Sequence, residues 1–324
     1  MTTIYLHIGM PKTGTTCLQK ALFNNREKLL QNAYLYPNCG IKYNAKEIVN
    51  RYCHNTLAHS LMGFENKDNA LSQFTVWEEL KREIDSINPK NVIISAEAFT
   101  SFEIFYQLET LAKIKNFLKE YEIKIVIYLR KQDEFLESSY CYMVKLGACS
   151  VGIKELFNEY QYIFNYYQIL ENWADIFGYE NIIVRRYEKS NKKNHVFDDF
   201  LGVINQFDNK RDYKIDYAAK LNVSPSGKTI KMLLLVNKFN ETILARLLKL
   251  DDNYWSKYQD FLNFLSNNKT ISEIVSKLPN FLVDNVLLSS EEKQDFMRQF
   301  KELNSQVANK YLGQKDGILF GDYS

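Results

Sequence analysis

The residues best suited to bind an anion lie at the start of the chain, in the run IYLHIGMPKTGTT from Ile4 to Thr16. A short apolar strand leads there into a turn with two glycines, several hydroxyl groups and one lysine, Lys12, and a helical pattern begins near Cys17. Inward-pointing backbone N–H groups, glycines that leave room for a ligand, and the dipole of a helix N-terminus together favour bound phosphate. The sequence therefore predicts a phosphate-binding loop between the first strand and the first helix.

The spacing within this loop resembles the skeleton of the nucleotide-triphosphate P-loop, G-x-x-x-x-G-K-[ST]. Gly9 and Gly14 are separated by four residues, and Thr15 and Thr16 follow. Thr15 occupies the usual lysine position, whereas Lys12 comes three residues earlier. We therefore expect Lys12 to meet a different atom of the ligand, and we do not expect a β,γ-phosphate pair here. A turn of Gly and Thr selected only for tight geometry is the structural alternative.

A second candidate anion site follows the apolar run Ile123 to Leu129, which ends in Arg130. Ser138 comes eight residues later, in a helical segment. A guanidinium fork and a hydroxyl group near a helix start suit a dianionic phosphate better than a lone lysine does. Taken alone, Arg130 could equally cap a helix or form an ion pair.

Together the two segments resemble the sulfotransferases that use 3′-phosphoadenosine 5′-phosphosulfate (PAPS). The run PKTGTT after a first strand looks like their 5′-phosphosulfate-binding loop, and the string HIGMPKTGTTCLQKAL is similar to bacterial members thought to act on glycans. The resemblance implies that Arg130 and Ser138 bind the 3′-phosphate of the donor. It also implies a set of residues around the 5′ end: Pro11, Lys12, Thr13, Gly14, Thr15 and Thr16. An ammonium group near the bridging oxygen stabilises the leaving group, so Lys12 is the candidate for that role.

The candidate base is Glu97, just past the second strand in VIISAEAF, where relatives of this family often place a catalytic Glu or His. A carboxylate that is partly desolvated by bound sugar and donor has a raised pKa and accepts a hydroxyl proton. The alternative is a carboxylate that only stabilises a helix N-terminus. His54 and His59 are the rivals of Glu97; they are five residues apart, so a helical metal pair is not expected. Either could orient an acceptor hydroxyl, with His59 the better candidate, but a structural histidine is the preferred interpretation of each. His7, inside the first strand, is expected in the core or in support of the site.

Two further segments bear on the donor. Tyr187 follows the fourth strand in VRRYEKS, where the family often has a tyrosine that approaches the adenine, and ring stacking is a plausible use. The chain lacks the Arg-Lys-Gly tripeptide of the eukaryotic cytosolic branch. The segment from Lys220 to Lys228 is a candidate substitute, although capping of the following helix is the preferred explanation for its Ser and Asn residues.

Apolar strands alternate with helical patterns along the first two thirds of the chain, which is typical of a parallel sheet covered by helices on both faces. The predicted strands are Ile4–Ile8, Val92–Ser95, Ile123–Leu129 and Ile182–Arg185. The predicted helices include Leu18–Leu30, Phe74–Ile87, Leu108–Tyr121, Phe135–Leu146, Tyr166–Phe177, Lys228–Phe239, Tyr254–Leu265 and Glu291–Tyr311. Lys12, Glu97 and Arg130 all follow strand ends, where ligands of such sheets bind. We predict a P-loop-like α/β core over residues 1–203 and a helical C-terminal portion over 204–324 packed on it.

The composition sets limits on the class of protein. The 324 residues include 41 basic and 39 acidic side chains, a formal charge of +2 that gives no global field for nucleic acid. Five cysteines without a C-x-x-C pair fit free thiols in a reducing compartment, and no metal is expected. With no basic leader and no apolar run long enough to span a membrane, we expect a cytoplasmic protein; work at a membrane surface stays open.

The resemblance implies a PAPS-dependent sulfotransferase that moves a sulfuryl group to a hydroxyl of a carbohydrate or glycolipid and releases adenosine 3′,5′-bisphosphate. A P-loop kinase is the first alternative, disfavoured by Thr15 and by the lack of an obvious acidic Walker-B strand end. A nucleotide-binding module without enzymatic activity is the second. The sequence does not indicate the acceptor, the sulfated position or the oligomeric state.

Overall fold

The computed structural model describes two compact units, each assembled from separate stretches of chain. The first comprises Met1–Arg130, Asn165–Ala219 and Glu302–Gly321, and the second comprises Lys131–Phe164, Lys220–Lys301 and Asp322–Ser324. Whether residues 1–203 form a domain of their own stays a prediction. The residues that the structure describes are 1–41, 52–62, 73–101, 104, 106–188, 196–204, 225–241, 252–279 and 286–321.

The first unit is built on one five-stranded sheet in the order β2-β3-β1-β4-β5, with every neighbouring pair parallel. Its strands are β1 (Thr3–His7), β2 (Tyr34–Leu35), β3 (Asn91–Ser95), β4 (Glu122–Leu129) and β5 (Ile182–Arg186). All five residues of β3 are buried, as expected for a central parallel strand that is covered on both faces. The predicted α/β fold with a helix-flanked parallel sheet is therefore confirmed.

Helices α1 (Thr15–Asn24), α2 (Arg26–Gln31) and α10 (Val196–Val203) pack on one face of this sheet. Their buried side chains meet the sheet in one apolar cluster that includes Leu18, Leu22, Phe197, Phe200, Val126 and Tyr128. A polar contact also holds α10, because Tyr128 Oη and Arg185 Nε both donate to the Asp199 carboxylate, at 2.8 and 3.0 Å. This face supports the loop that joins β1 to α1.

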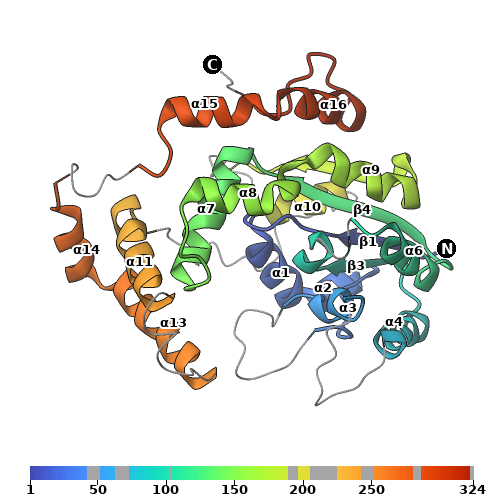
Figure 1. The fold of residues 1–324 in the computed structure, drawn as a ribbon. Coiled ribbons are helices and arrows are strands. Elements are labelled where there is room, and N and C mark those ends of the chain that lie inside the picture. Colours follow the sequence, from blue (N-terminus) through green and yellow to red (C-terminus); the bar gives the residue numbers. More distant parts are fainter. Residues whose placement is uncertain are drawn as a thin grey trace. The chain divides into compact units, whose positions relative to one another are not determined.

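Helices α4 (Gln73–Ile87), α6 (Leu108–Phe117) and α9 (Tyr166–Phe177) lie on the other face. Helix α9 packs on α6, β4 and β5, and Figure 1 shows it running along β4. Trp77 of α4 stacks on Phe117 of α6 with ring centroids 5.1 Å apart. This unit also contains three short elements, α3 (Asn55–His59), η1 (Glu97–Thr100) and η3 (Tyr179–Asn181), and the helix α16 (Lys301–Leu312).

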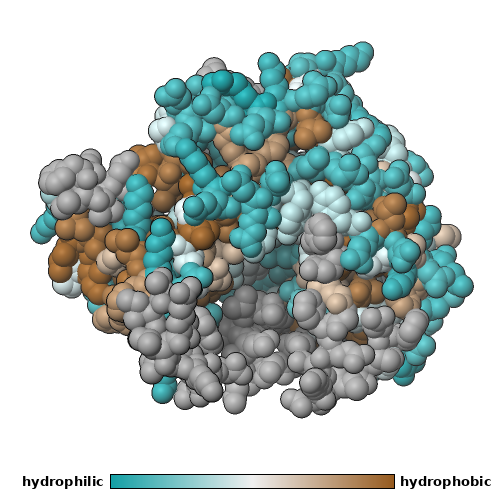
Figure 2. All heavy atoms as spheres, viewed as in Figure 1, coloured by the Kyte–Doolittle hydropathy of each residue, from teal (hydrophilic) through white to brown (hydrophobic). Residues whose placement is uncertain are grey.

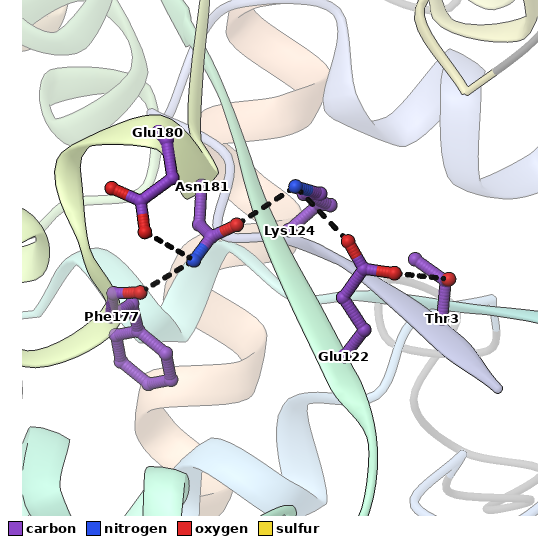
Figure 3. Close-up of polar contacts among 6 residues, drawn as sticks. All are labelled: Thr3, Glu122, Lys124, Phe177, Glu180 and Asn181. Atoms are coloured by element: carbon purple, nitrogen blue, oxygen red, sulfur yellow. Dashed lines mark hydrogen bonds and ion pairs between the residues drawn. The ribbon is translucent and has the colours of Figure 1, made fainter. Parts of the chain in front are cut away.

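A polar network closes the amino-terminal edge of the sheet (Figure 3). Thr3 Oγ1 donates to the Glu122 carboxylate at 3.0 Å. Lys124 Nζ lies 3.1 Å from the same carboxylate and donates to Asn181 Oδ1 at 2.8 Å. Asn181 in turn donates to the Phe177 carbonyl at 2.7 Å. The side chains of this network satisfy one another, so we assign it to stability.

All the regular elements described in the second unit are helices. It contains α7 (Gln132–Lys145), α8 (Ile153–Tyr160), η2 (Gln161–Phe164), α11 (Gly227–Phe239), α13 (Asp252–Asn267), α14 (Lys269–Ser276) and α15 (Ser290–Arg298). Asn237 of α11 donates to the carbonyls of Val144 and Cys149, both at 2.8 Å, and accepts from Tyr258 Oη at 2.8 Å. This buried amide joins α7 to α11 and α13.

The helices α11, α13 and α14 also expose apolar side chains. Leu235, Phe264 and Ile274 are more than half exposed, at 64%, 57% and 61%, and Figure 2 shows hydrophobic residues over α11 and α14. The helical C-terminal portion that the sequence predicts is confirmed for the described residues. Among those residues, no helix combines the length and apolar character that crossing a bilayer requires.

Candidate functional site

The loop between β1 and α1 reverses the chain through three residues of positive φ: Gly9 at +33°, Lys12 at +65° and Gly14 at +79°. Thr13 Oγ1 donates to the Met10 carbonyl at 2.6 Å and closes the turn. Gly14 is the N-cap of α1 and has no side chain with which to cap the helix. The first N–H groups of α1 are thus suited to an anion.

The two glycines are required by close neighbours. A Cβ on Gly9 would lie 2.9 Å from Thr15 Cγ2 and 3.1 Å from His7 Cε1. A Cβ on Gly14 would lie 3.1 Å from the Tyr187 ring, in a backbone conformation that already disfavours side chains. Tyr187 follows β5, which lies at one edge of the sheet. Its ring nevertheless packs directly against the loop, as these distances show.

Arg130 holds the loop from the end of β4. Its Nη1 donates to the Lys12 carbonyl at 2.9 Å, and its own carbonyl accepts from Tyr166 Oη at 2.7 Å. The guanidinium carbon also lies 5.6 Å from the centroid of the Tyr187 ring. The structure thus brings together Lys12, Arg130 and Tyr187, which are far apart in the sequence.

The Arg130 contact explains how Lys12 keeps its backbone conformation. The left-handed region costs a non-glycine residue about 1–2 kcal/mol. A charge-assisted hydrogen bond from a guanidinium that is only 7% exposed can offset that cost. Arg130 therefore stabilises the conformation of the loop through this hydrogen bond, without a bound ligand.

Glu97 begins η1 directly after β3 and is partly buried. Burial raises the pKa of its carboxyl to about 7, and the charge of Lys12 opposes that rise. Lys12 and Glu97, two of the three predicted catalytic residues, are therefore within electrostatic reach of each other. A carboxyl with a pKa near neutrality suits general base catalysis.

Thr100 connects Glu97 to the loop, a link that the sequence did not reveal. Its hydroxyl lies 2.8 Å from the Glu97 carbonyl and 3.1 Å from the Gly9 carbonyl, and its side chain is buried. The available signal was a hydroxyl residue three positions after Glu97 in an apolar segment. Thr100 thus fixes η1 against the first glycine.

The histidines behave differently from one another. His54 is fully buried: its Nδ1 accepts from the Ser95 N–H at 3.1 Å and its Nε2 donates to the Pro37 carbonyl at 3.0 Å. Backbone groups thus occupy both ring nitrogens of His54, which assigns it a structural role, and burial lowers its pKa to about 4. His59 is the last residue of α3, which packs against η1, and its role as an alternative base stays a prediction.

Two other predicted segments are placed as follows. Ser138 lies in α7 of the second unit and is half-buried, so its pairing with Arg130 stays a prediction. Ser226 caps α11 by accepting from the Thr229 N–H at 3.2 Å, as the capping alternative required. Lys228 donates to the Ser276 carbonyl at 3.0 Å. Residues 220–224 and His195 lie outside the described residues.

No family model matches the sequence. An uncharacterized protein of Archaeoglobus fulgidus is 29% identical over 233 residues, which are 71% of this chain and 56% of that protein, so the chain spans about half the length of this curated relative. The fold is also similar to that of a sulfotransferase from Alicyclobacillus acidocaldarius, with a TM-score of 0.42 and 15% identity over 79% of this chain and 98% of that one.

Proposed function

We propose that this chain is a sulfotransferase that transfers a sulfuryl group from PAPS to a hydroxyl group of a carbohydrate or glycolipid. The observation that carries the proposal is the meeting of Lys12, Glu97, Arg130 and Tyr187 around one loop at the carboxyl end of the sheet. An amine, a carboxyl group with a pKa near 7, a guanidinium and an aromatic ring are the groups that sulfuryl transfer from an adenosine nucleotide requires.

The residues present fit such a donor. The loop offers the N–H groups at the start of α1, and its two glycines take the positive φ angles that the turn before this helix requires. The loop residues 11–16 would bind the 5′ end, Arg130 with Ser138 the 3′-phosphate, and Tyr187 would lie near the adenine. When bound, PAPS supplies an activated sulfuryl group that is joined to a phosphate by one S–O bond.

The side chains would then divide the reaction between them. Glu97 takes the proton of the acceptor hydroxyl while the hydroxyl oxygen bonds to sulfur. Lys12 stabilises the negative charge that forms on the phosphate oxygen as the S–O bond breaks. The products are a sulfate ester and adenosine 3′,5′-bisphosphate, and Glu97 returns its proton to solvent. Arg130 and Thr100 hold the loop in place during these events.

Calorimetry tests the proposal against the kinase alternative. We expect adenosine 3′,5′-bisphosphate to bind without metal and ATP with magnesium to bind weakly, because Thr15 occupies the usual P-loop lysine position. Tight binding of ATP that requires magnesium would instead indicate a kinase. Transfer of radiolabelled sulfate from PAPS to a panel of sugars separates an enzyme from a binding module and identifies the acceptor.

Replacing Arg130 should reduce discrimination in favour of the 3′-phosphate. In Arg130→Ala we expect the ratio of affinities for adenosine 3′,5′-bisphosphate and adenosine 5′-phosphate to fall about ten- to a hundredfold, since a hydrogen bond between charged groups contributes roughly 1.5–3 kcal/mol. Arg130→Lys should recover only part of it, because the planar fork is lost. Titration calorimetry with both nucleotides gives the ratio.

Arg186→Ala is the matched control for that experiment. Arg186 lies just before Tyr187 and donates to the Leu319 carbonyl at 3.3 Å, so its loss should leave the ratio unchanged. Equal weakening of both nucleotides in Arg130→Ala would show that Arg130 acts only through the Lys12 carbonyl.

A further inference from the structure

His7 is the last residue of β1 and lies directly below the loop. His7 is 1% exposed, and its ring meets those of Tyr128 and Phe200 in edge-to-face geometry, with ring centroids 5.8 and 5.7 Å apart. In the sheet it is opposite Ser95 of β3. The ring edge with Cε1 and Nε2 faces Gly9, since a Cβ on that glycine would lie 3.1 and 3.4 Å from these two atoms.

The hydrogen bonds of Ser95 define which nitrogen of His7 carries the proton. Ser95 Oγ accepts from Gln19 Nε2 at 3.1 Å and lies 2.7 Å from His7 Nδ1. A serine oxygen can accept from two donors, but its own proton needs an acceptor. Gln19 offers a donor there, and His7 Nδ1 is the one acceptor in contact with Ser95 Oγ among the described residues, so it takes the hydroxyl proton of Ser95. His7 is consequently a neutral imidazole with its proton on Nε2. Burial lowers its pKa to about 3, so it stays neutral across the physiological range.

His7 Nε2 has no hydrogen-bond partner among the described residues, although the atom is fully buried. Buried N–H groups are almost always paired in folded proteins, and one without a partner calls for an explanation. His54 shows the contrast. It shares Ser95 with His7 and also carries its proton on Nε2, but that proton is donated to the Pro37 carbonyl at 3.0 Å. The loop side of His7 therefore has an unused donor next to the first glycine.

We propose that Nε2–H of His7 is a neutral hydrogen-bond donor to the anion that the loop binds. The acceptor would be an oxygen of the 5′-phosphosulfate or 5′-phosphate of the nucleotide, and this identification of the anion rests on the proposed function. A neutral donor adds a directed hydrogen bond without a second full charge beside Lys12, whose ammonium stays the principal cation of the loop. Ser95 and Gln19 are then positioning residues, because they fix the tautomer of His7.

NMR of the imidazole nitrogens tests the proposal without any activity measurement. The chain has only four histidines, and two-bond proton–nitrogen spectra assign them with His7→Gln and His54→Gln as references. We expect both buried rings to carry the proton on Nε2. On titration with adenosine 3′,5′-bisphosphate, the His7 Nε2 and Hε2 resonances should shift and those of His54 should stay in place. A proton on Nδ1 of His7, or unchanged His7 resonances at saturation, would overturn the proposal and leave water as the partner of Nε2.

The outcomes separate this inference from the proposed function. If calorimetry shows that the nucleotide binds while His7 does not respond, the inference fails and the sulfotransferase proposal stands. If the nucleotide does not bind, the proposed function fails, and inorganic phosphate becomes the probe of the loop. A His7 shift with phosphate would still support the donor role, whereas no response to either anion would overturn it.

Substitutions give a second readout. His7→Phe keeps the ring contacts but removes the donor, and we expect it to weaken nucleotide binding about ten- to a hundredfold. His7→Gln can place an amide N–H near the position of Nε2 and should recover most of the affinity. His54→Gln is the matched control, a change at the other buried histidine that should leave affinity unchanged in the folded protein. Wild-type affinity in His7→Phe would overturn the proposal.

Discussion

Replacing Lys12 by Ala should lower turnover about 10²–10³-fold while weakening the binding of adenosine 3′,5′-bisphosphate about tenfold or less. The reason is that an ammonium beside the breaking S–O bond contributes most where charge develops, in the transition state, and removal of one such group typically costs this much in kcat. Alanine keeps the Cβ and so leaves the left-handed backbone of residue 12 as it is in the wild type. Single-turnover rates and calorimetry measure the two effects separately.

Two further variants make the Lys12 result specific. Lys12→Arg keeps the charge but alters its position, so an intermediate rate is expected. Lys90→Ala removes an exposed lysine just before β3, at the opposite end of the sheet, and should leave both quantities unchanged. If turnover and affinity fall by the same factor in Lys12→Ala, Lys12 is a binding residue without a role in the chemical step.

Much of the sheet could be predicted because parallel strands that are buried on both faces consist of short, nearly continuous apolar runs. The four predicted strands match β1, β3, β4 and β5 to within one residue at each end. The two-residue strand β2, Tyr34–Leu35, carries too few residues for any periodicity and was missed. Pairing with β3, which is distant in the sequence, is what makes those two residues a strand.

Helix boundaries were less predictable where one polar residue interrupts an apolar pattern. The predicted helix Leu18–Leu30 is two helices, α1 and α2, that meet at Asn25. The Asn25 side chain donates to the Ala21 carbonyl at 2.8 Å, and its φ of −109° departs from helical geometry. The apolar period continues across this break, so periodicity alone gave one helix. The predicted helix Glu291–Tyr311 is likewise divided, into α15 and α16.

The candidate site was predictable only in part. Loop residues and Arg130 have local motifs, and the structure brings them together. His7 and Ser95 have no such motif, since each lies in an apolar strand and only the register of β1 against β3 makes them neighbours. Gln19 reaches Ser95 from helix α1. The same limit applies to the second unit, where α7 packs with helices from the distant C-terminal portion.

Replacing Glu97 by Gln should abolish most transfer, about 10²–10⁴-fold in kcat, while preserving donor affinity, because the amide cannot accept the hydroxyl proton. In the wild type, kcat/KM should rise with pH and level off above about pH 7, where the Glu97 carboxyl is ionised. The variant should lack this limb. Glu109→Gln, at an exposed position of α6, is the control and should keep the wild-type profile. Full activity in Glu97→Gln would move the base to His59 or elsewhere.

The same carboxyl makes a prediction about stability that does not depend on substrate. Burial raises its pKa from 4.5 to about 7, so the folded protein binds this proton more tightly than the unfolded chain does. That contribution is complete below pH 4.5 and is lost as the pH rises through about 7. Because Glu97 is partly exposed, we expect a loss of about 2 kcal/mol, less than the full shift implies. Urea denaturation at pH 4.5, 6 and 8 should show this decline in the wild type and a smaller one in Glu97→Gln. Identical pH dependence in both proteins would mean that the carboxyl is already ionised at acidic pH, and a base with a pKa near 7 would then have to be sought at another residue.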